Sequence, residues 1–580
     1  MPGFFGYKSN NKINFSLEIK DNLINEEIRI DNIYIHRHTI KKFLNDKIFK
    51  ETPGYFLLLD GILLNITDLK QRYNTNDLTY ILQKLYEEHG EKFCALLKGS
   101  FSGLLYDKIK GSMILFTDQI GTKQLFYYKD NDYFIFSSEI VDILQFCKEV
   151  GISITLNKIA AYLMLTNSYY FEDITLINEI KKLPAGTFIN FSKVNLNVRK
   201  YYLLKNKPGN FTDEDEIIEK IDELFKQALR RSLKKNREYQ YKNMASLSGG
   251  LDSRMTTWVL NEIKEDADEV INYTYSQSNY LDESIAKSIA NYLGNTFIFK
   301  SLDNGLSMMK LDEATKVSEG MISYPALGQL VGFTELFNFN EIGIVHTGMM
   351  GDAVIGDHYI GHSKNNEINI FDKATSLKLK DKLNGLDISG KYENQEMFNF
   401  YSRGFSGMNL ATPLIFQQYT ETYSPYYDID FMEYCLSIPL KFRINYYIYY
   451  KWILKKYPDA SRYKWEKTNS KITALQIKIK GKKIPLKQLI PKILTNIGIL
   501  NSSLKTKRHM NPYDYWYNNN SKVKNFMDLY FDANINVINN IELKNDCKLL
   551  YAQDKTSEKC LVLSLLAAIK LFLTYGLSTN

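Results

Sequence analysis

The stretch that decides the fold is Ser248-Gly249-Gly250-Leu251-Asp252-Ser253, which follows a short apolar run ending at Leu247 and opens a predicted helix. Paired glycines let the backbone approach a ligand closely, and the first turn of a helix offers N–H groups and a dipole that favour anions. Two serine hydroxyls add donors, and Asp252 places a carboxylate where a metal ion would bridge it to the anion. The lysine of a GxxxxGK(S/T) P-loop is missing, so a different kind of phosphate-binding turn is predicted.

Strands and helices alternate around this turn, which favours a parallel, doubly wound sheet. From about Lys310 onward the chain is predicted to be mostly helical. The predicted elements around the turn are, in order, a helix over 216–235, a strand ending at 245–247, a strand over 270–275, a helix over 282–293 and a strand over 296–300.

The N-terminal part has a different pattern. Residues 1 to about 205 are predicted to be β-rich, because short apolar runs lie between Gly, Asn and Asp turn signals. One helix, over 78–88, interrupts the strands. The polar stretch 206–215 is interpreted as a linker. We therefore predict two domains, an α+β sandwich of packed sheets over 1–205 and an α/β domain with a helical C-terminal part over 206–580.

The composition indicates a globular protein. Of the 580 residues, 44% are hydrophobic and 24% are charged, which excludes a disordered or fibrous chain, and the net charge of +7 names no nucleic-acid partner. Five scattered cysteines without CxxC spacing argue against disulfides and favour a reducing cytoplasm. We expect no signal peptide, and the apolar stretch 560–573 is too short to span a membrane. The sequence thus predicts a soluble, cytoplasmic protein.

One segment is strongly basic. From Lys471 to Arg508 there are nine lysines, one arginine and no acidic residue. This pattern fits a solvated insertion, and it also fits a docking surface for an acidic peptide or carrier. Aromatic residues are absent from the segment, which disfavours binding to single-stranded nucleic acid.

Motifs along nearly the whole chain resemble the asparagine synthetase-like family. The turn at 248–253 matches the pyrophosphate-binding loop of the PP-loop ATP pyrophosphatases, and TGMMGD at 347–352 is similar to the second nucleotide loop of asparagine synthetases. The resemblance implies an Ntn-hydrolase-like sandwich followed by a PP-loop ATP pyrophosphatase domain. Further segments resemble the family's pattern: 99–107, 118–128, 136–140 and 183–186 in its glutaminase domain, then 421–428 and 465–468 in its synthetase domain.

The resemblance also implies the site residues. ATP is expected on the first loop, Mg²⁺ between Asp252 and Asp352, and Lys467 beside the charge that develops during the reaction. His358 and Glu421 are alternative bases for the attacking amine, and the sequence does not choose between them. The expected nucleotide-binding residues are Leu247, Ser248, Gly249, Gly250, Asp252, Ser253, Tyr275, Thr347 and Gly348.

Departures from the family pattern bear on the function. Family glutaminases have a cysteine after the initiator methionine, whereas this chain has Pro2 and no cysteine before Cys94. The family's Asn-Gly-Glu is Asp60-Gly61-Ile62, although Asp77 keeps its place. The family's glutamate in the second loop is Met349, which neither takes a proton nor binds a cation. We therefore predict a glutaminase scaffold that no longer hydrolyses glutamine, joined to a domain that still uses ATP.

The resemblance implies an AMP-forming ligase that adenylates a carboxylate and lets an amine attack it. Relatives that share the loss of the glutaminase are the β-lactam synthetases and the lasso-peptide (macrolactam) cyclases, whose amine belongs to the substrate itself, and this subtype is favoured. Amidation of aspartate or a sugar uronate by free ammonia is a second hypothesis. A non-catalytic ATP-binding scaffold is a third. Modification of tRNA is disfavoured, because no nucleic-acid-binding module is visible.

Overall fold

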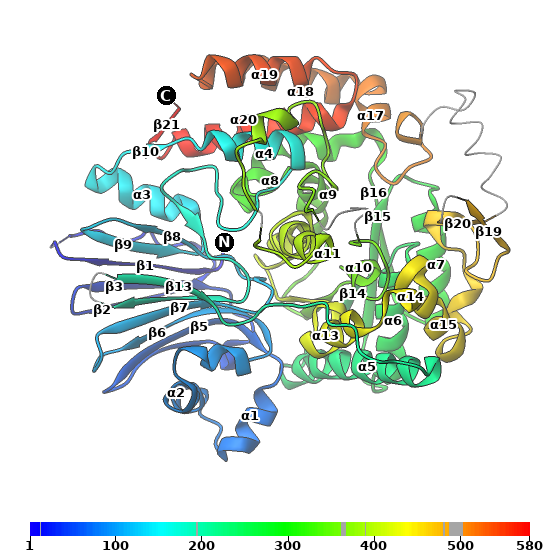
Figure 1. Cartoon of the computed structure of the whole chain (residues 1–580), viewed down its shortest axis with the longest axis horizontal. Helices are drawn as coiled ribbons and strands as arrows, with labels where there is room; N and C mark the ends of the chain where they lie inside the picture. Colours follow the sequence, from blue (N-terminus) through cyan, green and yellow to red (C-terminus); the bar gives the residue numbers. More distant parts are fainter. Residues whose placement is uncertain are drawn as a thin grey trace.

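Two β-sheets form the N-terminal part of the computed structural model, which describes residues 1–11, 13–192, 195–360, 367–388, 390–479, 482–485 and 503–579. Both sheets have six strands, and every neighbouring pair of strands is antiparallel. In Figure 1 they are stacked at the left of the molecule. The first sheet has the order β11 (Lys181–Lys182), β8 (Phe126–Lys129), β9 (Tyr133–Ser137), β1 (Gly3–Ser9), β3 (Ile33–Thr39), β2 (Ile24–Ile30), and the second has the order β13 (Asn195–Lys200), β12 (Thr187–Ser192), β7 (Ser112–Thr117), β6 (Gly99–Asp107), β5 (Tyr55–Leu63), β4 (Ile48–Glu51).

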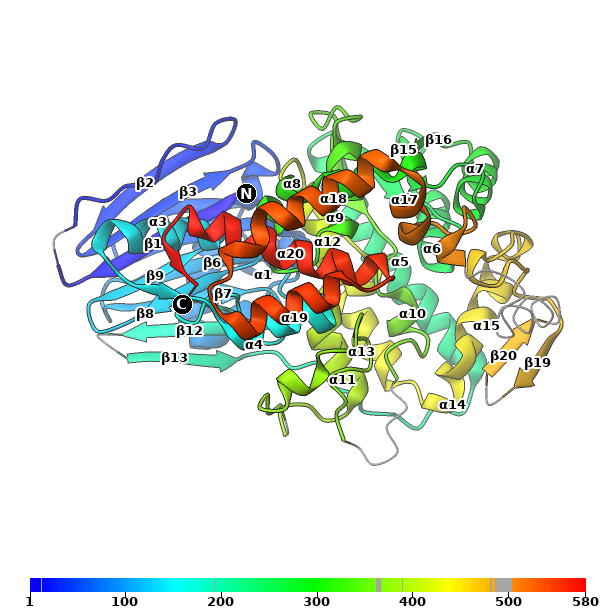
Figure 2. The same cartoon turned by 90° about the horizontal axis from the view of Figure 1, so that it is seen from above.

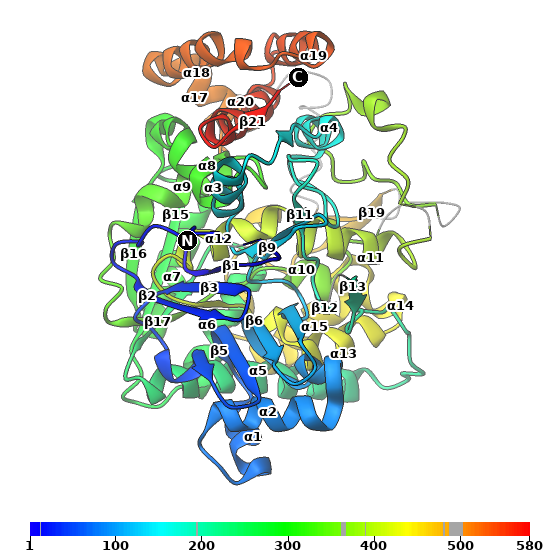
Figure 3. The same cartoon turned by 90° about the vertical axis from the view of Figure 1, so that its left-hand side faces the viewer.

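Helices cover the outer faces of this sandwich. Between the sheets, buried side chains such as Phe4 and Phe136 from one sheet pack against Phe56 and Leu104 from the other. Helices α1 (Ile66–Tyr73) and α2 (Leu78–His89) cover the second sheet, below the strands in Figure 3, and α3 (Ile140–Val150) covers the first. The predicted sandwich of packed sheets is confirmed.

The N-terminal part contains more helix than the sequence predicted. The predicted helix over 78–88 is α2, but α1, α3 and α4 (Lys158–Asn167) were not expected. Helix α4 is the clearest case, because every residue from Ala160 to Asn167 is buried. A helix enclosed on all sides has no polar face, so its apolar run shows no 3.6-residue period.

A parallel sheet of five strands forms the second part, at the right of Figure 1. Its order is β16 (Thr296–Ser301), β15 (Val270–Ser276), β14 (Lys242–Ser246), β17 (Ile342–His346), β18 (Thr422–Tyr423), and all neighbours are parallel. Helices α5 (Glu214–Glu238), α6 (Leu251–Ile263) and α7 (Leu281–Leu293) share one apolar core on one face. The predicted alternation of strands and helices, and the doubly wound sheet, are confirmed.

The rest of the chain is mostly helical, as predicted. Figure 2 shows the C-terminal helices α17 (Tyr513–Asn519), α18 (Ser521–Asn534), α19 (Ile541–Tyr551) and α20 (Thr556–Leu573) running across the molecule. The remaining helices are α8 (Leu311–Ser318), α9 (Pro325–Thr334), α10 (Gly351–Val354), α11 (Gln395–Asn399), α12 (Ala411–Phe416), α13 (Ile429–Ser437), α14 (Leu440–Arg443) and α15 (Tyr447–Lys456), and a hairpin joins β19 (Gln476–Ile479) to β20 (Lys482–Pro485).

The C-terminal end returns to the N-terminal part. Helix α20 packs against α4, and β21 (Leu577–Ser578) pairs in parallel with β10 (Ile154–Thr155). One apolar core contains Phe146 and Leu163 together with Leu330 and Leu566. The apolar stretch 560–573 lies within α20 and is mostly buried, as predicted. Among the described helices, none combines the length and the apolarity needed to cross a bilayer.

Candidate active site

The candidate site lies where the order of the parallel strands reverses. β14 and β17 are neighbours, and each leads at its carboxyl end into a loop, one over 247–250 and the other over 347–350. Ligands of doubly wound sheets bind in the crevice at this point. The loops approach each other so closely that a Cβ on Gly348 would lie 2.3 Å from the backbone nitrogen of Ser253. Glycine is therefore required where the second loop passes the first turn of α6.

Hydrogen bonds shape the first loop around the N-terminus of α6. The backbone nitrogen of Ser248 donates to Oγ of Ser253 over 3.0 Å, and that of Gly250 donates to Oγ of Ser248 over 3.1 Å. The backbone nitrogen of Gly249 donates to the carboxylate of Asp282 over 2.6 Å. Backbone N–H groups and hydroxyls thus converge on the helix N-terminus, which is the arrangement that binds phosphate.

The two loops line an open pocket of about 360 Å³, which we call the nucleotide pocket after the ligand that the sequence predicts for it. Gly249 is not among its lining residues, but a Cβ on it would lie 2.7 Å from Cβ of Glu466, so the pocket wall packs directly behind it. Of the residues named from the sequence, the pocket brings together Leu247, Ser248, Gly250, Asp252, Ser253, Tyr275, Thr347, Gly348 and Met349.

Asp252 lines the pocket, and Asp352, which is not among the lining residues, lies directly beside it. Oδ2 of Asp252 accepts from the backbone nitrogen of Asp352 over 2.9 Å, and Oδ1 accepts from the Tyr449 hydroxyl over 2.9 Å. Burial, and then the nearby charge of Asp352, raise the pKa of Asp252 to about 8. A buried carboxylate beside a second one is destabilised as an anion, and a divalent cation relieves that cost. The pair therefore fits the predicted Mg²⁺.

Lys467 and His358 stand beside this carboxylate pair. Nζ of Lys467 lies 2.8 Å from the Tyr446 hydroxyl, and its charge lowers the pKa of Asp252 below what burial alone would give. Nδ1 of His358 lies 3.6 Å from Oδ2 of Asp352. Burial lowers the pKa of His358. Both residues predicted from the sequence are thus near Asp252 and Asp352, although neither lines the pocket between the two loops.

Glu421 is placed elsewhere. Its side chain is fully buried, and its oxygens accept from Nζ of Lys123 over 2.8 and 3.0 Å. Lys123 belongs to the N-terminal part, so Glu421 lies in the contact between the two parts and does not line the nucleotide pocket. The neighbouring Ser424 supports the second loop, because its hydroxyl donates to the backbone carbonyl of Met349 over 2.9 Å.

Sequence reasoning missed several residues of the pocket. Asp282 begins the helix that follows β15, so its place after a parallel strand was a usable signal. Burial and the neighbouring Glu466 raise the pKa of Asp282 to about 6. Thr412 and Met510 come from distant segments and carry no local signal. The same is true of Tyr449, which contacts Asp252 from α15.

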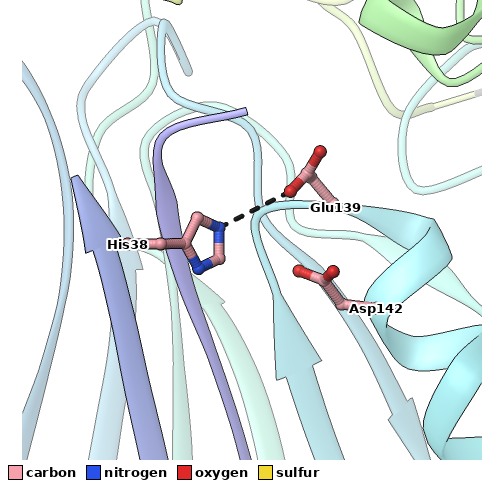
Figure 4. Close-up of side chains that lie close together, drawn as sticks. All are labelled: His38, Glu139 and Asp142. Atoms are coloured by element: carbon pink, nitrogen blue, oxygen red, sulfur yellow. Dashed lines mark ion pairs between the residues drawn. The ribbon is translucent and has the colours of Figure 1, made fainter. Parts of the chain in front are cut away.

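The N-terminal part also has a cavity, of about 820 Å³, lined by Met1, Pro2 and Lys20 among others. Figure 4 shows His38 pointing toward Glu139, 3.5 Å away, with Asp142 alongside. Ligand atoms of these three residues lie within 4.8 Å of one another, as in a metal site. However, the ammonium of Lys20 already contacts all three. The cluster is therefore neutralised by the chain itself.

The residues at the family's glutamine-binding positions have structural partners. Asp60 is fully buried and accepts from the Thr39 hydroxyl over 2.6 Å. Burial alone would raise its pKa, but Lys47 and Lys123 lower that pKa below its usual value. Asp77 caps α2 by accepting from the backbone nitrogen of Thr79 over 2.8 Å.

Only the two ends of the predicted basic docking segment are described. Residues 480–481 and 486–502 lie outside the described residues. The backbone of the hairpin strands β19 and β20 is described, but their side chains are not. Beyond Arg508 the chain reaches the nucleotide pocket, where Met510 is a lining residue.

Comparisons with known proteins agree with this arrangement. Residues 4–202 match the model of a glutamine amidotransferase domain. The chain is 29% identical over 216 residues to a Methanocaldococcus jannaschii protein named as asparagine synthetase (glutamine-hydrolyzing) 2, covering 36% of this chain and 41% of the relative. It is 23% identical over 252 residues to asparagine synthetase (glutamine-hydrolyzing) 1 of Bacillus subtilis, covering 42% and 38%. The chain thus spans less than half the length of these curated relatives.

Solved structures give a weaker likeness. Glutamine phosphoribosylpyrophosphate amidotransferase from B. subtilis, complexed with ADP and GMP, has a TM-score of 0.22 and 14% identity, covering 47% of this chain and 77% of its own. Glutamine-dependent NAD⁺ synthetase from Acinetobacter baumannii has a TM-score of 0.18 and 15% identity, covering 44% and 49%.

Proposed function

Since the chain is an asparagine synthetase-like protein, we propose that it is an AMP-forming, ATP-dependent amide-bond ligase without glutaminase activity. The observation that supports this most is the meeting of two loops at the switch point of the parallel sheet, where the carboxylate of Asp252 accepts from the backbone nitrogen of Asp352. A pocket of this kind suits a nucleotide whose phosphates carry a divalent cation.

The first loop binds the leaving pyrophosphate of ATP. Its backbone N–H groups and the hydroxyls of Ser248 and Ser253 surround the N-terminus of α6. The backbone nitrogen of Gly249 already donates to Asp282, so a phosphate would have to displace that carboxylate to use this N–H group. Asp252 and Asp352 would hold Mg²⁺, which neutralises phosphate charge when it is bound.

The substrate carboxylate then attacks the α-phosphorus, pyrophosphate leaves, and an acyl-adenylate forms. An amine attacks the acyl carbon, an amide forms, and AMP leaves. Lys467 supplies positive charge beside the reacting groups, a form of stabilisation often worth several kcal/mol. His358 suits the role of base better than Glu421, because His358 lies beside Asp352 whereas Glu421 is buried against Lys123 away from the pocket.

The favoured subtype is a cyclase that uses an amine carried by its own substrate, as in lasso-peptide (macrolactam) or β-lactam formation. Pro2 lines the cavity of the N-terminal part where a thiolate would be needed, and no cysteine is among that cavity's described lining residues. Met349 lines the nucleotide pocket where a carboxylate would handle ammonia. Both substitutions remove functions that an intramolecular amine does not require.

The test is AMP release from Mg·ATP by the full-length protein, with hydroxylamine as a trap for the acyl-adenylate. Candidate acids are supplied alone, with ammonium, and as peptides that carry both an amine and a carboxylate. We expect AMP and an acyl-hydroxamate with amine-bearing acids, and about 10²- to 10³-fold less of both with Asp252→Asn. The exposed Asp266→Asn, outside the pocket, is the matched control and keeps wild-type rates.

Each result separates the hypotheses. Asparagine formed from aspartate and ammonium would replace the cyclase with an ammonia-dependent synthetase. Nucleotide binding without AMP from any acid would favour the non-catalytic scaffold. Hydrolysis of glutamine to glutamate would contradict the loss of glutaminase activity.

A further inference from the structure

One N–H group of the first loop is already occupied by a carboxylate of the chain. The backbone nitrogen of Gly249 donates to Oδ1 of Asp282 over 2.6 Å, and both residues are buried. Ser248 and Gly250, on either side of Gly249, line the nucleotide pocket, whereas Gly249 does not. Asp282 does line the pocket. Its carboxylate therefore stands between this N–H group and a phosphate that enters the pocket.

The first loop is held in this position from its other side. The carbonyl oxygen of Gly249 accepts from the backbone nitrogen of Glu466 over 3.0 Å and from Nη2 of Arg254 over 3.2 Å. Arg254 is fully buried and also donates to the carbonyl oxygen of Ala460 over 3.2 Å. The loop cannot turn its N–H group away from Asp282 without breaking these bonds. A phosphate that uses the N–H group must therefore displace the carboxylate.

The helix that carries Asp282 is also fixed. Asp282 lies in the first turn of α7, and Ile285, Ala286 and Ile289 of that helix are buried in the core that α7 shares with α5 and α6. Because both the loop and the helix are held, the part that yields to a phosphate is the side chain of Asp282. It returns to the N–H group when the phosphate leaves.

The charges that line the nucleotide pocket favour this return. Among the described lining residues, Asp252, Asp282 and Glu466 are acidic and none is Lys, Arg or His. A divalent cation at Asp252 and Asp352 would offset part of this charge. Burial, and then the charge of Glu466, raise the pKa of Asp282 to about 6, and the hydrogen bond from Gly249 opposes that increase. A phosphate that takes this N–H group thus removes the partner of a buried carboxylate and brings two like charges together.

We infer that Asp282 competes with the leaving pyrophosphate for the N–H group of Gly249 and thereby speeds the release of pyrophosphate after adenylation. The inference rests on the proposed function for the identity of the anion. It assigns Asp282 a role in product release. The wild type then holds pyrophosphate, and the same phosphates within ATP, less tightly than a chain that lacks this carboxylate.

The test is isothermal titration of the full-length protein with inorganic pyrophosphate and Mg²⁺. Asp282→Asn keeps an acceptor for Gly249 but removes the charge, and a neutral acceptor is displaced more easily than a charged one. We expect Asp282→Asn to bind pyrophosphate about 10-fold more tightly, the lower end of the range for a hydrogen bond to a charged group. Most of the gain should appear as slower dissociation of labelled pyrophosphate during a chase. A non-hydrolysable ATP analogue should also bind more tightly.

A second variant and a matched control accompany this titration. Asp282→Ala removes the acceptor altogether and should also tighten binding, whereas loss of a merely structural contact would loosen the loop and weaken binding. The control is Glu283→Gln, because Glu283 follows Asp282 on α7, accepts from the backbone nitrogen of Asn279 over 2.7 Å and is not among the described lining residues. It should leave the affinity nearly unchanged. If neither Asp282 variant binds pyrophosphate more tightly than the wild type, the inference is overturned.

Failure of this inference and failure of the proposed function give different results. If no acid yields AMP but Asp282→Asn still binds pyrophosphate more tightly, the proposed ligase activity is wrong and the competition at Gly249 stands. If AMP forms as proposed while the wild type and both Asp282 variants bind pyrophosphate equally, only the role of Asp282 in release is wrong.

Discussion

Buried carboxylates occur in both parts of the molecule, and the two groups differ in what neutralises them. In the N-terminal part, Asp60 lies between Lys47 and Lys123, and the cluster of His38, Glu139 and Asp142 surrounds the ammonium of Lys20. The chain supplies these cations itself.

In the nucleotide pocket, the carboxylates have hydrogen bonds but no Lys or Arg ion pair among the described residues. Asp252 accepts from Tyr449, Asp282 from the backbone of Gly249, and Glu466 from Tyr280. Burial, and then the charges of Asp352 and Glu466, raise the pKa values of Asp252 and Asp282 to about 8 and about 6. The carboxylates of the second part are thus the ones whose charge a bound cation would neutralise, as the proposed function requires.

Glu319 is an exception to this difference between the two groups of carboxylates. It lies beside Glu139 in the N-terminal group, and burial, followed by the charge of Glu139, raises its pKa to about 8. Its partners are backbone N–H groups at the start of α3, including that of Val141 at 3.1 Å. A helix N-terminus thus takes the place of a cation for this one carboxylate.

The largest expected effect comes from removing an internal cation. Lys123→Met leaves Glu421 and Asp60 buried with less positive charge, which should lower the free energy of unfolding by about 3–5 kcal/mol. Urea unfolding measures it. The control Lys84→Met removes an exposed pair with Glu87 and should leave the stability nearly unchanged. The double variant Lys123→Met/Glu421→Gln should recover part of the lost stability. If it recovered none, Lys123 would not be needed to neutralise Glu421.

Removing a pocket carboxylate should act in the opposite direction on stability. Asp252→Asn should reduce AMP formation by about 10²- to 10³-fold, a loss typical of a missing electrostatic group at a reacting centre. It should also stabilise the nucleotide-free protein, because the native fold disfavours the charged carboxylate. Stopped assays of AMP and thermal unfolding check the two effects. If Asp252→Asn were less stable than the wild type, Asp252 would belong with the carboxylates that the chain's own cations neutralise.

The close contact of the two loops gives a third, smaller effect. Gly348→Ala would place a Cβ 2.3 Å from the Ser253 nitrogen, so the loops must separate, at a cost of about 1–3 kcal/mol. We expect weaker binding of the ATP analogue, measured by titration. Gly385→Ala is the matched control, since nothing lies within 4 Å of a Cβ there. Unchanged nucleotide affinity in Gly348→Ala would show that the second loop is not part of the site.

Local patterns predicted most of the fold in the second part. The strand, turn and helix around 248–253 follow from apolar runs, two glycines and helical spacing, all within a few residues. Helix α4 was missed because it is buried on all sides, and the pairing of β21 with β10 joins segments more than 400 residues apart. Pairings at such separation leave no trace in local periodicity.

The site was predictable where it is built from loops that follow strands. Asp252 and Asp352 both follow β-strands of one parallel sheet, and such loops meet at the same edge. Tyr449 and Glu466 reach the pocket from helical segments whose position depends on the packing of the whole domain. Glu421 was also predicted from a local motif that follows a strand, but its side chain contacts Lys123 and lies away from the pocket.

The last effect is a pH dependence that separates the two groups of carboxylates. Because the folded pKa of Asp252 is raised to about 8, the folded state binds its proton more tightly than the unfolded state. The contribution of Asp252 to the free energy of unfolding is therefore largest below the usual carboxyl pKa of about 4. It falls as the pH rises toward 8, by up to about 1.4 kcal/mol per pH unit. Asp60 has the opposite sign: its lowered pKa gives stability that is present above about pH 4 and is lost on acidification.

The measurement is the free energy of unfolding of wild type and Asp252→Asn between pH 5 and 8. Other raised groups, Glu319 and Asp282 among them, contribute to both proteins, so the difference between the two isolates Asp252. We expect this difference to grow with pH in favour of the variant, and to shrink when Mg²⁺ and an ATP analogue are present, because the cation then takes the place of the proton. A difference that stays constant with pH would mean that Asp252 is already compensated by the chain, as Asp60 is.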